Sequence, residues 1–116
     1  MLLLVEHDRD LAELFAHLAQ RAGWQIILAP DIASAREFVR VAPPLAALVV
    51  EQIAVEVHGA ELFDYARSVH AGITCAVVVD FDRRSRESHL RGSGVTLLPK
   101  PVEPEALLAL LRRARP

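Results

Sequence analysis

Four residues have side chains that could take part in binding or catalysis. Glu6 and His7 follow a short apolar segment at the start of the chain, Glu51 follows a second one, and Lys100 follows a third. Carboxylate oxygens and an imidazole nitrogen can bind a metal ion or exchange protons, and an ammonium group can neutralise a carboxylate. If the fold brings these residues together, they form a charged cleft.

Two kinds of chemistry are disfavoured by the sequence. Glu6, His7, Asp8 and Glu51 have side chains that suit Zn²⁺, but the sequence has no His-x-x-x-His, His-Glu-x-x-His or paired-Cys spacing. His7 beside Glu51 could act as a general base, yet no nucleophile or oxyanion site accompanies it. We therefore expect no enzymatic activity, no metal and no cofactor.

Short apolar segments alternate with segments of helical periodicity. The expected strands are 2–5, 25–29, 46–50, 75–79 and 95–98. The expected helices follow Asp8, follow Asp31, cover 62–69, cover 84–91 and begin at Pro104. In the first of these helices Leu11, Leu14, Phe15, Leu18 and Ala22 recur at helical spacing and form its expected apolar stripe.

Strands that are apolar at every position indicate a sheet covered on both faces. This pattern predicts an α/β protein with five parallel strands and helices on either side. Crossovers of one hand place functional sites at the carboxyl ends of the strands. We therefore expect Glu6, His7, Glu51 and Lys100 to meet at one edge of the sheet.

Several motifs together resemble the receiver domain of bacterial two-component response regulators. They are Leu-Leu-Val-Glu-His-Asp at the first strand, the 45-residue step from Glu6 to Glu51, Gly59 eight residues later, and Leu-Leu-Pro-Lys-Pro around Lys100. The resemblance covers nearly the whole chain and implies a flavodoxin-like (βα)5 fold in a single domain, residues 1–116. It also implies a role in phosphorelay signal transduction.

By this resemblance, Glu6 and His7 occupy the acidic pair, Glu51 the phosphoacceptor Asp and Lys100 the pocket lysine. A histidine in the acidic pair replaces a metal-binding oxygen with nitrogen, although Mg²⁺ prefers oxygen. A Glu at the acceptor position places its carboxylate one carbon further out. Both departures oppose phosphoryl transfer.

The positions that would report phosphorylation also depart from the family. The switch hydroxyl falls on Val79 or Asp80, and the aromatic switch falls on Leu97. None of these side chains is a hydroxyl or an aromatic ring. The resemblance therefore implies an atypical pseudo-receiver that works as a protein-interaction module without phosphorylation.

We expect Glu51 to pair with Lys100 and His7 to be protonated by its acidic neighbours. Two alternatives remain open. The cleft of Glu6, His7, Glu51 and Lys100 could sense a metal or small ligand, or the chain could be a conventional phosphoacceptor receiver.

Composition restricts the location and partners of the chain. With 116 residues, 53% of them hydrophobic and 24% charged, it fits one globular domain. It has no secretory signal and no apolar run of the roughly 20 residues that span a bilayer, so a cytoplasmic location is expected. Cys75 is expected to be a buried structural thiol. The remaining histidines are expected at the surface: His17, His58, His70 and His89.

Arginines cluster in two segments near the end of the chain. They are Arg83, Arg84, Arg86 and Arg91 in the expected fourth helix, and Arg112, Arg113 and Arg115 at the end of the fifth. In receivers the fourth helix, fifth strand and fifth helix bind protein partners or a second copy, so we expect an interaction face there. A net charge of −2 and the absence of a following DNA-binding segment make nucleic acid an improbable partner.

Overall fold

Five parallel strands form one sheet, as the apolar segments predict. The computed structural model describes residues 1–51, 61–79 and 94–114. Within the sheet the order is β2-β1-β3-β4-β5. The strands are β1 (Leu2–Val5), β2 (Ile26–Ala29), β3 (Ala47–Glu51), β4 (Thr74–Val79) and β5 (Thr96–Pro99).

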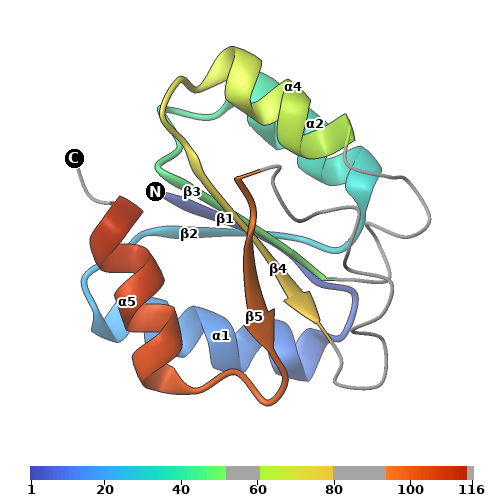
Figure 1. The fold of residues 1–116 in the computed structure, drawn as a ribbon. Helices are drawn as coiled ribbons and strands as arrows, with labels where there is room; N and C mark the ends of the chain where they lie inside the picture. Colours follow the sequence, from blue (N-terminus) through green and yellow to red (C-terminus); the bar gives the residue numbers. More distant parts are fainter. Residues whose placement is uncertain (52–60, 80–93, 115–116) are drawn as a thin grey trace.

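Helices cover both faces of this sheet, which confirms the expected architecture. In Figure 1, α1 and α5 lie against one face and α2 and α4 against the other. The helix expected at 84–91 falls outside the described residues. None of the described helices has the length and apolar character needed to cross a membrane. Their bounds are α1 (Arg9–Arg21), α2 (Ile32–Val41), α4 (Glu61–Val69) and α5 (Pro104–Ala114).

The two-residue periodicity of the strands divides the core into two layers. Leu3 and Val5 pack on the side of α2 and α4, and Leu2 and Leu4 pack on the side of α1 and α5. All four side chains are at most 2% exposed. Burial on both faces explains why β1 is apolar at every position.

Capping residues fix where two of the helices begin. The Asp8 carboxylate accepts hydrogen bonds from the backbone N–H groups of Asp10 (3.0 Å) and Leu11 (3.3 Å). Asp31 accepts one from the N–H of Ser34 at 2.7 Å. These contacts satisfy donors that the first helical turn leaves unpaired. Because Asp8 starts α1 directly after β1, Glu6 and His7 are held in a short turn at the sheet edge.

The expected buried stripe of α1 is partly wrong. Leu14 is 58% exposed and Leu11 is 42% exposed, whereas Ala12, Phe15 and Ala19 are buried. The small alanines belong to the core layer shared with α5, so the helix is rotated away from the leucine stripe. Two large apolar side chains are therefore left at the surface of α1.

His70 is buried, which corrects the expectation that it lies at the surface. Its Nδ1 accepts a hydrogen bond from the backbone N–H of Leu45 at 3.1 Å. The other ring nitrogen, Nε2, must then carry the proton that it donates to the carbonyl of Val39 at 2.8 Å. The side chain thus ties the end of α2 to the segment before β3.

Cys75 is buried, as expected, at 2% exposure. Burial raises the pKa of its thiol, and this favours the unreactive protonated form. The structure therefore agrees with a packing role for this residue.

Candidate functional site

Strand register places Glu6 and Glu51 next to each other. In the parallel ladder Leu4 pairs with Val49 and Val5 pairs with Val50, so the next step sets Glu6 beside Glu51. The backbone N–H of Glu6 continues the ladder on its other side by donating to Ala29. Two carboxyl groups consequently meet at the carboxyl edge of the sheet, and both residues are less than 9% exposed.

His7 closes this site from the solvent side. Its Nδ1 lies 2.6 and 2.7 Å from the two carboxylate oxygens of Glu51. It also lies 3.6 Å from Oε1 of Glu6. The His7 side chain is 61% exposed, whereas that of Glu51 is only 6% exposed. The imidazole therefore covers the otherwise buried carboxylate of Glu51.

The carboxylates favour the charged form of His7, as the sequence predicted. The hydrogen bond with Glu51 and the negative charge of that residue raise the pKa of the imidazole. Glu6 and Asp8 raise it further by their charges. A protonated ring donates from Nδ1 to Glu51 and keeps Nε2 as a second donor.

For Glu6, in contrast to His7, the surroundings favour the uncharged form. Burial, followed by the hydrogen bond with Glu51, raises the pKa of Glu6 from 4.5 to about 7. The backbone N–H of Asp8, which donates to Oε1 at 3.1 Å, and the charge of Lys100 partly oppose this rise. The protonated form of Glu6 is therefore substantially populated near neutral pH.

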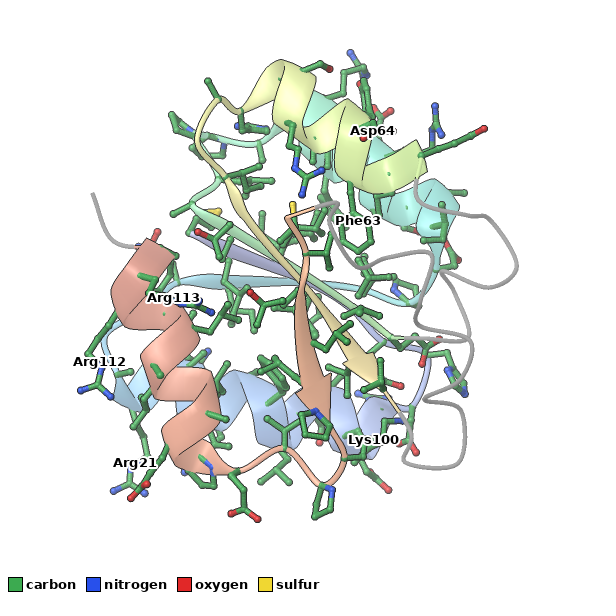
Figure 2. The ribbon with its side chains drawn as sticks, in the orientation of Figure 1. Arg21, Phe63, Asp64, Lys100, Arg112 and Arg113 are labelled. Carbon is green, nitrogen blue, oxygen red and sulfur yellow. The ribbon has the colours of Figure 1, made fainter. Side chains whose placement is uncertain are left out.

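Lys100 reaches the site from the turn after β5. Its backbone N–H donates to the carbonyl of Val79 at 2.9 Å, which fixes the start of the turn. Figure 2 labels its side chain at the edge of the sheet. Its charge lowers the pKa of Glu6. The expected pairing of Lys100 with Glu51 stays a prediction; the contacts of Glu51 described above are with His7 and Glu6.

Aliphatic side chains occupy the two described switch positions. Val79 is 1% exposed at the end of β4. Leu97 is partly buried and packs against the core layer of α2 and α4. Asp80, the other position proposed for the switch hydroxyl, lies outside the described residues. Neither Val79 nor Leu97 can hydrogen-bond a phosphoryl group through its side chain.

The donor set at this edge also fits a metal ion. One ligand atom from each of Glu6, His7 and Glu51 lies within 4.8 Å of the other two. Two carboxylates with one imidazole suit a borderline ion such as Zn²⁺ better than Mg²⁺, which prefers oxygen ligands alone. A bound cation would neutralise the two carboxylates in place of the proton and the imidazolium.

A cavity beside the site was not anticipated from the sequence. It has a volume of about 390 Å³, and Glu6 and Lys100 lie at one end of it. Leu11 and Leu14 line its wall. Their spacing in the sequence instead suggests that they face the core. The sequence feature that could have indicated this cavity is the position of both leucines in the first turns of α1, close to Glu6 and His7.

By sequence, the chain matches no protein-family profile and no curated protein. Solved structures are similar to it in fold. A response regulator receiver domain from Clostridium thermocellum superposes with a TM-score of 0.82 and 12% identity, over 97% of this chain and 91% of that one. An adenylate cyclase structure from Rhodopirellula baltica has a TM-score of 0.80 and 15% identity, over 97% and 87%.

A third structure, ShkA Rec1 in complex with c-di-GMP, has a TM-score of 0.73 and 23% identity, over 97% of this chain and 89% of that one. At these identities the likeness concerns the fold alone. The strand order, the parallel sheet and the helices on both faces agree with it. The chain therefore has the flavodoxin-like α/β fold found in response regulator receiver domains.

Proposed function

We propose that residues 1–116 form a single signalling domain that works without phosphorylation by binding a protein partner. The observation that carries this proposal is the contact between His7 and Glu51, at 2.6 and 2.7 Å. It occupies the position where a receiver would hold a free acceptor carboxylate. The domain then acts as a fixed interaction module in a cytoplasmic signalling pathway.

The contact opposes phosphoryl transfer in two ways. Both oxygens of Glu51 lie within hydrogen-bond distance of Nδ1 of His7, and this contact lowers their nucleophilicity toward a phosphoryl donor. Glu51 also carries one more methylene than Asp, and a misplacement of about 1 Å can slow a positioned reaction on the order of 100-fold. Breaking the charge-assisted hydrogen bond would add a further cost.

Signal readout would fail as well in this account. A phosphoryl group near Glu51 would find an aliphatic side chain at Val79, and Leu97 would have no ring to reorient. The pocket is thus held in one state by His7 and Glu51, with Lys100 supplying positive charge beside Glu6. Direct pairing of Glu51 with Lys100 is a second way to hold the same state.

A partner or a second copy would bind at α5, β5 and the segment 84–91. The described part of this face ends in Arg112 and Arg113, which Figure 2 shows on the last turns of α5. Arg113 also donates to the hydroxyl of Thr96 at 3.2 Å, which links α5 to β5. An R112E substitution should weaken self-association or partner binding, measured by sedimentation velocity and affinity capture, whereas R9E on α1 should not.

Beryllofluoride, which mimics a phosphoryl group, tests this proposal. Wild-type protein with Mg²⁺ and beryllofluoride should keep its amide NMR spectrum, including the signals of Glu51 and Lys100. The E51D/H7D double variant restores the receiver carboxylates and should show shifts at the site. Saturable shifts of the wild-type amides would refute phosphorylation independence.

Metal sensing is the second candidate, and the close approach of three ligand atoms favours it. Zn²⁺ bound by Glu6, His7 and Glu51 should raise the melting temperature, because a ligand of the folded state stabilises it. Trp24, the single tryptophan, provides a fluorescence signal for the same titration. An H7A variant should lose the response, whereas H17A, an exposed histidine on α1, should retain it.

A further inference from the structure

The cavity between α1 and the turn after β5 has the features of a small-molecule site. Its volume of about 390 Å³ falls in the range of ligand pockets, about 300–1,000 Å³. Leu4 and Val78 of the sheet line it, and both are at most 4% exposed. Its remaining walls come from α1 and from Pro101 and Val102.

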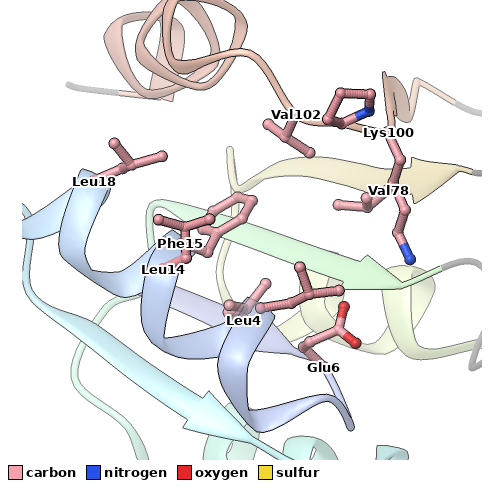
Figure 3. Close-up of a pocket in the computed structure, with 10 residues that line it drawn as sticks. Leu4, Glu6, Leu14, Phe15, Leu18, Val78, Lys100 and Val102 are labelled. Carbon is pink, nitrogen blue, oxygen red and sulfur yellow. The ribbon is translucent and has the colours of Figure 1, made fainter.

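Polar groups gather at one end of this cavity. In Figure 3 the carboxyl group of Glu6 and the ammonium group of Lys100 lie together beyond Leu4 and Val78. The Glu6 carboxylate already accepts from the backbone of Asp8. Lys100 has three N–H donors, so it can bind a ligand anion alongside its other interactions. The polar end is therefore suited to an anionic head group.

The apolar part of the cavity continues along α1. Leu18 lines both this cavity and a second hollow of about 340 Å³, which runs between the end of α1 and the start of α5. Leu108, 36% exposed, lies on that second hollow. An elongated, unbranched apolar chain would reach from the first hollow toward the second past Leu18.

Exposure of Leu11 and Leu14 gives an independent indication. A surface helix ordinarily turns its leucines to the core, yet these two are 42% and 58% exposed at the cavity. A bound apolar chain would cover them. Each methylene group removed from water contributes favourably to binding, so their exposure in the unbound protein is consistent with a ligand surface.

We propose that this cavity binds an aliphatic monocarboxylate, with its carboxylate at Lys100 and its chain along Leu11, Leu14 and Leu18. The site is distinct from the contact of His7 with Glu51 and does not depend on it. Because Glu6 lines the cavity and also contacts Glu51, occupancy would be felt at the carboxyl edge of the sheet.

Decanoate, titrated below its micelle concentration, is the probe for this site. Isothermal titration calorimetry should show one saturable site, and amide NMR shifts should be confined to α1 and residues 100–102. Hexanoate should bind on the order of 100-fold more weakly, since each lost methylene reduces affinity about four-fold. At pH 6, where Glu6 is largely protonated, decylammonium should bind less tightly than decanoate, because Lys100 repels it.

Three variants complete the test. K100M keeps most of the aliphatic part of the side chain but removes the ammonium group. It should reduce decanoate affinity by about ten-fold, since the hydrogen bond between that group and the carboxylate is lost. L14S should reduce it by a similar factor. V41S replaces a residue that is 57% exposed on α2, across the sheet, and should leave affinity unchanged. Binding that does not saturate, lacks dependence on chain length, or survives both K100M and L14S would overturn the proposal.

Discussion

The buried carboxyl group of Glu6 should make folding stability depend on pH in a defined direction. Its pKa is about 7 in the folded protein against 4.5 as the ordinary value. Between these pH values the folded state holds a proton that the unfolded chain has lost. Stability attributable to Glu6 is therefore fully present below about pH 4.5 and is lost as pH rises through about 7.

The size of this effect follows from the two pKa values. A rise from 4.5 to about 7 corresponds, at about 1.4 kcal/mol per pKa unit, to about 3 kcal/mol. Glu6 retains 8% exposure and lines the adjacent cavity, so solvent screening should reduce the effect to about 1–2 kcal/mol. Replacing Glu6 by Gln removes this dependence while keeping the shape and one donor toward Glu51.

Urea unfolding at pH 5 and pH 8 measures the effect. The stability of E6Q relative to wild type should be higher at pH 8 than at pH 5 by about 1–2 kcal/mol. His7 contributes in the same direction, because its raised pKa also favours the folded state at lower pH, but it is present in both proteins. E105Q, at an exposed glutamate of α5, should reproduce the wild-type curve. An E6Q difference that is equal at both pH values would show that Glu6 does not hold an extra proton in the folded state.

Three further substitutions test the fold that positions the site. H70A should lower the free energy of unfolding by about 2–4 kcal/mol, measured by urea denaturation, because it leaves two buried backbone groups unpaired. H17A, which replaces an exposed histidine of α1, should lower the free energy of unfolding by less than about 0.5 kcal/mol. D31A should cost about 1 kcal/mol by removing the cap of α2, and D31N should restore most of it. L107A should cost about 2–5 kcal/mol and L108A much less, since Leu107 is fully buried; equal losses would contradict the packing described.

Much of the fold could be predicted from short-range patterns. β1 has the predicted bounds, β2 and β4 differ from prediction by one residue at the start, and β3 and β5 are shifted by one residue at both ends. These segments were recognisable because burial on both faces makes them apolar throughout. The caps at Asp8 and Asp31 were also recognisable, because an N-cap is a local contact between residues two or three apart.

The convergence of Glu6, His7 and Glu51 was predictable from topology, but their pairing was not. Parallel strands bring their carboxyl ends to one edge whatever residues they carry. Which cation meets Glu51 depends on side-chain rotamers and on the turn after β1. The predicted pairing of Glu51 with Lys100 stays a prediction beside the contact of Glu51 with His7.

The rotation of α1 was the other feature that periodicity missed. The helix has two overlapping faces. One carries Leu11 and Leu14, and the other carries Ala12 and Ala19. Residue hydrophobicity favours the leucine face, but close packing against the sheet and α5 favours the small residues. The long-range packing that decides between them cannot be read from local spacing.

We propose that the pairing of His7 with Glu51 replaces phosphoryl chemistry in this domain. Intact-mass analysis after incubation with Mg²⁺ and acetyl phosphate tests it most directly, with the E51D/H7D double variant as the repaired comparison and E51Q as the control for the acceptor. We expect no phosphoryl adduct on wild-type protein under conditions in which the repaired variant becomes labelled. An adduct on wild-type protein that disappears in E51Q would show that Glu51 still accepts a phosphoryl group and that the domain retains receiver chemistry.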